Sequence, residues 1–92
     1  MDKVIAVVVT YNRRQLLSEC IDALRRQTRK VDAIFVVNNG STDDTEEWLQ
    51  AQPDVDFVTQ QNLGGAGGFA RAIQTGYVRG YQWIWCMDDD AP

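Results

Sequence analysis

Three consecutive aspartates are the residues of this sequence best suited to chemistry. Asp88, Asp89 and Asp90 follow an apolar run at residues 83–87. Two carboxylates about 4 Å apart repel each other by about 4 kcal/mol at an effective dielectric constant of about 20, unless water or a cation neutralises them. Their oxygens suit Mg²⁺ or Mn²⁺, which often share their coordination with substrate phosphates. Because ligands of open α/β sheets bind where strands end, we favour a metal site over a solvated acidic tail.

The elements that would position these carboxylates are strands alternating with helices. Apolar runs predict strands at residues 4–9, 34–37, 56–59 and 81–87. Helices are predicted to begin near Asn12, near Ser41 or Thr42, and after the glycine cluster at residues 64–68. This alternation predicts a three-layer α/β fold with a four-stranded parallel sheet.

Polar residues follow the predicted strands, and a parallel sheet brings such residues to one edge. The clusters are Thr10 to Asn12, Asn38 and Asn39, Asn62 with the glycines after it, and Asp88 to Asp90. Their convergence supports a binding site more strongly than any single cluster does.

Some of these polar residues have structural interpretations. Asn12, with a glutamine three residues later, is typical of a helix capping box, and Ser41 or Thr42 is predicted to cap the next helix. Asn38 differs because it ends a buried strand, where its amide can accept from and donate to a base edge. Arg13 opposes the helix dipole, so it is either a phosphate or base contact or a solvated surface arginine.

The glycine cluster allows two interpretations. Gly65, Gly67 and Ala70 fit the dinucleotide fingerprint GxGxxG/A, which makes an NAD- or FAD-binding Rossmann half an alternative function. The fingerprint follows the third predicted strand instead of the first, and a tight turn before a closely packed helix explains the glycines equally well.

The predicted third helix and fourth strand carry many of the aromatic residues. Phe69, Ile73 and Tyr77 recur at helical spacing, and the two later glycines of this segment are expected to allow close packing and to end the helix. Trp83 and Trp85 alternate on one face of the strand, where we expect core positions.

Composition limits the class of protein. Ninety-two residues form one domain, and 45% apolar with 24% charged residues are typical of a globular protein. A net charge of −4 argues against nucleic acid or an anionic membrane as a partner. The sequence has no histidine and no CxxC pair, so zinc is not expected, and its two cysteines suit a reduced, cytoplasmic protein. No apolar run is long enough to span a membrane.

Four segments, in this order, resemble the N-terminal half of a family-2 glycosyltransferase with a GT-A fold. They read VVVTYNR, VVNNGSTDDT, NLGGAGGFARA and MDDDAP, and the last two are most similar to the galactofuranosyl- and rhamnosyltransferase-like branch. The resemblance implies a Rossmann-like nucleotide-binding half with strand order 3-2-1-4 and a UDP- or dTDP-sugar as donor. It also implies inverting transfer to a hydroxyl that a carboxylate base activates.

The resemblance also implies roles for single residues. The nucleotide-binding set would be Thr10, Tyr11, Arg13, Asn38, Asn62, Gly65, Asp88 and Asp89, and the metal ligands of the DxD motif would be Asp88 and Asp90. Asn38 stands where the family commonly has an aspartate that binds uracil, and its carbonyl oxygen can still accept a hydrogen bond. The cofactor would be Mn²⁺ or Mg²⁺, acting as a Lewis acid on the departing nucleotide diphosphate.

In the family, the base and the acceptor site follow the DxD motif. We therefore expect residues 1–92 to be a single donor-binding domain, truncated just after that motif, with no catalytic residue and no transfer activity of its own. The last strand would then be an open apolar edge, which predicts a homo-oligomer. Two other classes stay open: a non-catalytic interaction module, and a nucleotidyltransferase, although no basic glycine-rich loop follows the first predicted strand.

Overall fold

The apolar runs form the strands of one parallel sheet, and helices connect them. The computed structural model describes residues 3–27, 31–61 and 64–88. Its elements are β1 (Val4–Thr10), α1 (Arg14–Arg25), β2 (Ala33–Asn38), α2 (Thr45–Gln50), β3 (Val55–Thr59), α3 (Gly64–Val78) and β4 (Trp83–Asp88). The strands pair in parallel in the order β3-β2-β1-β4. The predicted α/β fold and its strand order are confirmed.

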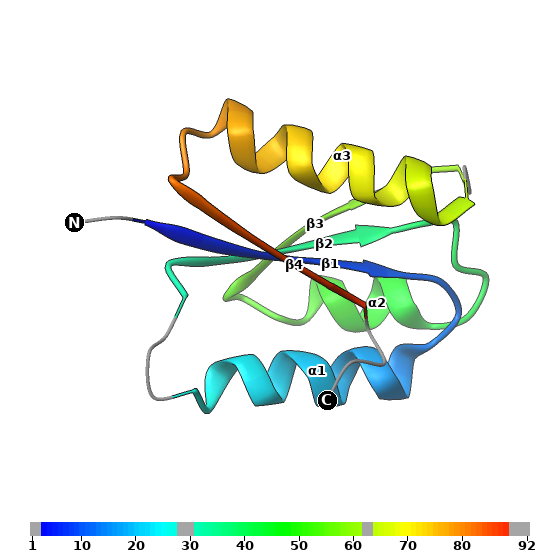
Figure 1. Cartoon of the computed structure of the whole chain (residues 1–92). Coiled ribbons are helices and arrows are strands. Elements are labelled where there is room, and N and C mark those ends of the chain that lie inside the picture. The colour runs from blue at the N-terminus through cyan, green and yellow to red at the C-terminus, as the bar shows by residue number, and fades with distance from the viewer. Residues whose placement is uncertain (1–2, 28–30, 62–63, 89–92) are drawn as a thin grey trace.

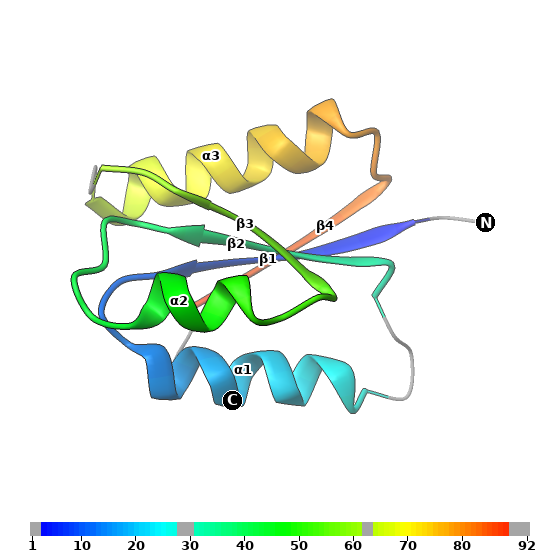
Figure 2. The same cartoon turned by 180° about the vertical axis from the view of Figure 1, so that it is seen from behind.

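Helices cover both faces of the sheet (Figure 1, Figure 2). α1 and α2 lie on one face, and α3 lies on the other. Because successive residues of a strand point to opposite faces, β1 contributes Ala6 and Val8 to the core beneath α1, and Ile5 and Val7 to the core beneath α3. The central strands are therefore buried on both sides, as their continuous apolar runs predict.

The two helical layers use different side chains to contact the sheet. α1 buries Leu17, Cys20, Ile21 and Leu24, which recur along one side of the helix at intervals of three and four residues. Burying one aliphatic side chain of this size contributes about 1.5–3 kcal/mol to folding. Large apolar side chains therefore fill the space beneath α1.

α3 contacts the sheet through small residues instead. Gly68, Ala72 and Gly76 are buried at intervals of four residues. A Cβ atom at Gly68 would lie 2.6 Å from Cγ1 of Val9, and one at Gly76 would lie 2.8 Å from side-chain carbons of Ile84. These distances are too short for real side chains, so the helix approaches the sheet as closely as it does because glycine lacks a Cβ atom. The predicted close packing is confirmed at Gly76, whereas a Cβ atom at Gly80, just after the end of the helix, would have no neighbour within 4 Å.

Larger apolar side chains of α3 and β4 are exposed. Ile73 is 49% exposed and Tyr77 is 80% exposed, because they lie one position away from the side of the helix that faces the sheet. Trp83 and Trp85 are 60% and 45% exposed. The prediction of core positions for the two tryptophans is wrong, because β4 is an edge strand that pairs with β1 alone in the described part of the chain.

Candidate functional site

The strand register brings the predicted polar clusters to one edge of the sheet, which we call the carboxyl edge because the strands end there (Figure 1). Thr10 of β1 is level with Asn38 of β2, and Asn38 is level with Thr59 of β3. On the other side of β1, Val9 is level with Asp88, the last residue of β4. The strand ends therefore form one row, beside the loops that lead to the helices.

Thr10 and Asn38 are buried in the middle of this row. The amide of Asn38 uses both of its ends within the chain. Its Nδ2 donates to Oγ1 of Thr59 at 3.2 Å, and its Oδ1 accepts from the backbone N–H of Ser41 at 3.4 Å. Asn38 therefore joins β3 to the loop that follows β2, and a base that contacted its amide would have to share or replace these bonds.

Asn39 is a second buried amide at the same edge. Its Nδ2 donates to the backbone carbonyl of Gly64 at 3.0 Å, and its Oδ1 accepts from Nε2 of Gln60 at 3.3 Å. Its backbone N–H donates to the carbonyl of Thr10 at 2.9 Å. One residue thus fixes the first residue of α3 against the ends of β1, β2 and β3. The sequence pattern indicates only a turn here. The one signal of a structural role is that Asn39 directly follows a buried strand.

Asn12 joins the loop after β1 to the loop after β2. Its Oδ1 accepts from the backbone N–H groups of Thr42 at 2.7 Å and Asp43 at 3.3 Å, and its own N–H donates to Oγ of Ser41 at 3.0 Å. The predicted capping box is wrong. The residue before α1 is Arg13, which makes no side-chain cap, because the amide of Asn12 contacts a loop some thirty residues away instead of the helix that follows it.

α2 begins later than the sequence pattern predicts. Neither Ser41 nor Thr42 caps the helix, because both contact Asn12, and the first helical residue is Thr45. The carboxylate of Asp43 accepts from the backbone N–H of Thr45 at 3.0 Å and also from its hydroxyl. The N-cap residue is Asp44, which makes no side-chain cap, so Asp43, one residue earlier, is the residue whose side chain bonds the first N–H of α2.

The start of α1 also contributes to the environment of Asp43. Desolvation acts to raise the pKa of the Asp43 carboxyl, but hydrogen bonds from Thr45 and from the backbone N–H of Arg14 outweigh it and hold that pKa below its usual value. Arg14 and Asp44 approach each other to 3.6 Å. The Asp43 carboxyl is therefore ionised at neutral pH, and the starts of α1 and α2 approach each other at the pair formed by Arg14 and Asp44.

The other predicted site residues differ in their exposure. Tyr11 and Arg13 are exposed beside Asn12. Gly65 lies in the first turn of α3, and Asp88 ends β4 in register with β1. Asn62, Asp89 and Asp90 lie outside the described residues.

The metal prediction depends on residues at the border of the described region. Within residues 3–27, 31–61 and 64–88, no group of three or more His, Cys, Asp or Glu side chains could hold a metal ion. Asp88 ends its strand at the carboxyl edge, two residues before Asp90. Two carboxylates form an all-oxygen donor set, which fits Mg²⁺ or Mn²⁺.

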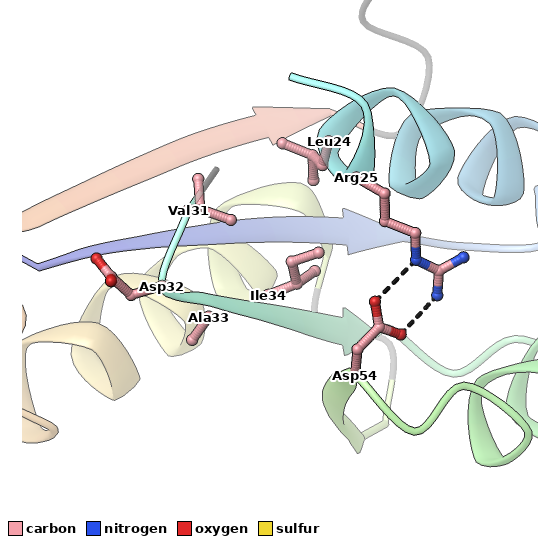
Figure 3. A pocket seen from close by; sticks show the side chains of 7 residues that line it. All are labelled: Leu24, Arg25, Val31, Asp32, Ala33, Ile34 and Asp54. Carbon is pink, nitrogen blue, oxygen red and sulfur yellow. Dashed lines mark hydrogen bonds and ion pairs between the residues drawn. The ribbon is translucent and has the colours of Figure 1, made fainter. Parts of the chain in front are cut away.

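A separate pocket lies at the opposite edge of the sheet, the amino edge, where the strands begin (Figure 3). Its volume is about 220 Å³, and it is lined by Leu24, Arg25, Val31, Asp32, Ala33, Ile34 and Asp54. Arg25 donates to both carboxylate oxygens of Asp54, at 2.9 and 2.7 Å. The charges of Arg25 and Asp54 therefore neutralise each other, and the second carboxylate of the pocket, Asp32, accepts from the backbone N–H of Val4. The pocket is remote from the polar row at the carboxyl edge.

The sequence matches the model of the family described as glycosyl transferase family 2 over residues 5–91. The chain belongs to glycosyl transferase family 2. This family assignment confirms the resemblance drawn from the four sequence segments, and it favours a glycosyltransferase over the dinucleotide-binding alternative. Among the glycines at the start of α3, Gly68 then has a packing explanation, since it allows the close contact with Val9.

Within the family, the chain is similar to galactofuranosyltransferases from two mycobacteria. Galactofuranosyltransferase GlfT1 of Mycolicibacterium smegmatis is 43% identical over 95% of this chain and 30% of its own length. GlfT1 of Mycobacterium tuberculosis is 39% identical over 97% of this chain and 31% of its own length. The chain thus spans less than a third of the length of these relatives. No helix in the described part of the chain is both long and apolar enough to cross a membrane.

Proposed function

We propose that this chain binds the nucleotide diphosphate of a UDP- or dTDP-sugar, together with Mn²⁺ or Mg²⁺, as the donor-binding portion of an inverting glycosyltransferase. The observation that supports the proposal is the row of strand ends at the carboxyl edge, where Thr10, Asn38 and Asp88 are level or nearly level across neighbouring strands. In open α/β sheets, ligands bind outside the carboxyl ends of the strands. Membership of glycosyl transferase family 2 supports a nucleotide-sugar as the donor.

The proposal gives each group at this edge a role. The exposed side chains of Tyr11 and Arg13 contact the nucleotide, and the guanidinium of Arg13 binds a phosphate or the base. The buried amide of Asn38 orients the loop at the base site, and its carbonyl oxygen would accept from the base only by sharing or replacing its bond with the Ser41 N–H. Asp88 and Asp90 hold the metal ion. A bound divalent ion would stabilise the negative charge of the leaving nucleotide diphosphate.

The relatives suggest a hexosyl donor to test first. Both GlfT1 proteins are named galactofuranosyltransferases, so we propose a UDP-linked galactofuranosyl group as the first candidate for the transferred sugar. Transfer itself is proposed for a whole protein of the relatives' length, in which the catalytic base and the acceptor site lie beyond the residues described. We propose no catalytic base among residues 1–92, and therefore no transfer by this chain alone.

Calorimetric titration tests the donor site directly. UDP and dTDP are titrated into the chain with Mn²⁺, with Mg²⁺ and with EDTA, and NAD⁺ is titrated in parallel. We expect at least one of the two diphosphates to bind, and EDTA or Asp88→Ala to weaken that binding by about tenfold or more. Asp54→Asn, at the amino edge, is the matched control and should bind normally. Binding of NAD⁺ without metal would contradict the proposal, and a chain that binds no nucleotide would instead be an interaction module.

We also propose that the edge strand β4 pairs with a second copy of the chain. Trp83 and Trp85 expose apolar surface on β4. In the described part of the chain, β4 is also an edge strand, which can pair with a further strand. Light scattering at micromolar concentration should give a mass above that of a monomer, and Trp85→Lys should lower it. A monomeric mass for the unmodified chain would refute this assembly without affecting the nucleotide site.

A further inference from the structure

We propose that Asn12 is a positioning residue, whose side chain holds the two nucleotide-facing loops of the carboxyl edge in one fixed arrangement. We call its contacts with Ser41, Thr42 and Asp43 the Asn12 bridge. The inference rests on the proposed nucleotide site. It adds a residue to which no binding role was assigned, since the sequence pattern gives Asn12 only a helix cap.

The Asn12 bridge has contacts in both directions between the loops. Oδ1 of Asn12 accepts from the backbone N–H groups of Thr42 and Asp43, and the hydroxyl of Thr42 lies 3.4 Å from the same oxygen. The backbone N–H of Asn12 donates to Oγ of Ser41. A single carboxamide oxygen thus satisfies two neighbouring N–H groups that would otherwise need water.

The backbone of Asn12 is as unusual as its contacts. Its φ of 51° lies in the left-handed region, where asparagine is tolerated and most other side chains are strained. Glycine also adopts this conformation readily, but it has no carboxamide. The position therefore requires two properties together, a tolerance for positive φ and an acceptor oxygen, and this lets substitutions separate them.

The neighbours of the bridge give it a role in binding. Tyr11 and Arg13 flank Asn12 in the chain and are exposed, and Asn38 precedes the second loop and is fixed to it through Ser41. A displacement of one loop would therefore move groups proposed to contact the nucleotide away from one another. Holding loops in their bound arrangement before the ligand arrives removes the ordering cost from binding and raises affinity.

The bridge also reaches helix α2. Asp43, whose N–H donates to Asn12, uses its carboxylate to accept from the N–H of Thr45, the first residue of α2. The orientation of the first loop is thus tied to the first turn of α2. This gives the loops a rigid support, because α2 buries Leu49 in the core.

Three substitutions at position 12 separate a positioning role from a general effect on folding. Asn12→Gly keeps the backbone conformation and removes the acceptor. Asn12→Asp keeps an acceptor oxygen and tolerates positive φ. Asn12→Ala removes the acceptor and strains the backbone. With Mn²⁺ present, we expect Asn12→Gly to bind UDP about tenfold more weakly than the unmodified chain, and Asn12→Asp to retain affinity within about threefold. Asn12→Ala should lose both affinity and melting temperature.

Amide hydrogen exchange, followed by NMR in the absence of nucleotide, reports on the bridge itself. The N–H groups of Thr42 and Asp43 should exchange faster in Asn12→Gly and keep their protection in Asn12→Asp. Asp54→Asn is the matched control, because it removes an ion pair at the amino edge. It should lower the melting temperature without changing UDP affinity or the exchange of these two amides.

The outcomes distinguish this inference from the proposed function. If the unmodified chain binds no UDP or dTDP, the nucleotide site and the positioning role both fail, whatever the exchange data show. If the unmodified chain binds and Asn12→Gly binds equally well, the positioning role alone is overturned. The same conclusion follows if Asp54→Asn weakens binding as much as Asn12→Gly does, because the effect would then reflect stability.

Discussion

The two edges of the sheet are held together by different kinds of contact. At the amino edge, ion pairs predominate: Arg25 contacts Asp54 at 2.7 Å and Asp22 at 3.1 Å, and Arg79 contacts Asp56 at 2.9 Å. At the carboxyl edge, the carboxamides of three asparagines connect the loops to one another. The edge with the proposed ligand site therefore uses mainly neutral groups for its own structure, although Arg14 and Asp44 form a loose ion pair there.

This difference has a physical consequence for binding. Arginine and carboxylate groups that neutralise each other are poor partners for a charged ligand, as in the pocket of Figure 3. Neutral amides can fix the position of loops without competing for the charge of a diphosphate or a metal ion. We expect substitutions of the asparagines at the carboxyl edge to lower the free energy of unfolding strongly and independently of salt. Substitutions in the ion pairs of the amino edge should lower it less, and by an amount that depends on salt.

The largest expected effect is at the buried amide of Asn38. Asn38→Ala removes the partner of Thr59 and of the Ser41 N–H, and an unsatisfied buried polar group costs about 1–3 kcal/mol. Urea unfolding should show a decrease of this size in the free energy of unfolding, and the affinity for UDP should fall as well. A loss no greater than that of Asp54→Asn would remove the proposed contrast between the edges.

Asp43→Ala should have the next largest effect. It removes the acceptor for Thr45, and the loss of such a helix cap costs about 0.5–2 kcal/mol. Because the folded-state pKa of Asp43 lies below the usual value of about 3.9, its contribution is fully present above that value and is lost as the pH falls through the folded pKa. Thermal unfolding from pH 7 to pH 2 should show the two proteins converging in acid, and a constant difference would contradict this assignment.

Asp54→Asn at the amino edge should cost less, up to about 1 kcal/mol, because its ion pair with Arg25 is half exposed. The hydrogen bond from Arg25 is the main cause that lowers the pKa of Asp54. Its contribution therefore also persists above about pH 4 and disappears as the pH falls through the folded pKa. Chemical unfolding at pH 7 and in acid measures how much Asp54→Asn lowers the free energy of unfolding. An equal decrease at both pH values would show that the ion pair is not the cause.

The smallest effect is that of salt on these differences. Raising the ionic strength to about 1 M shortens the Debye length to about 3 Å, which should reduce the cost of Asp54→Asn by a few tenths of a kcal/mol. The cost of Asn38→Ala should stay unchanged, since its bonds join neutral groups. Unfolding by urea, which is uncharged, keeps the added salt as the only ionic variable. If salt changed the effects of Asp54→Asn and Asn38→Ala on the free energy of unfolding equally, the proposed difference between the two edges would be contradicted.

The sheet and its order could be predicted because local patterns determine them. Runs such as residues 4–9 and 34–37 are apolar at every position, which occurs when both faces of a strand are covered. The polar ends of these runs then had to meet at one edge, and the register of Thr10 with Asn38 confirms that they do. The similarity of four ordered segments to family 2 supplied the strand order.

The side of α3 that meets the sheet could not be predicted from hydrophobicity. Phe69, Ile73 and Tyr77 are the large apolar residues at helical spacing, yet Gly68 and Gly76 make the contact. Apolar spacing indicates which side of a helix can be buried, but it does not measure how close the helix comes to its neighbour. Here the closer approach selects the side with the smallest residues.

The asparagine contacts were missed for a different reason. Asn12 followed by a helix satisfies the local rule for a cap, and the rule contains no information about a loop thirty residues later. The positive φ of Asn12 is equally invisible in the sequence, although asparagine is enriched at such positions. Amides that join separate loops depend on the tertiary fold, so their contacts can be identified only once the strands are in register.

The glycines of α3 also determine where that helix can sit along its own axis. Branched side chains from β1 and β4 occupy the space beside Gly68 and Gly76, so a residue with a Cβ atom at either position would collide with Val9 or Ile84. Val9 and Ile84 therefore limit how far α3 can shift along its axis. A smaller residue in place of Val9 would not bring the helix nearer; it would leave a void and allow the start of the helix to drift relative to the strand ends.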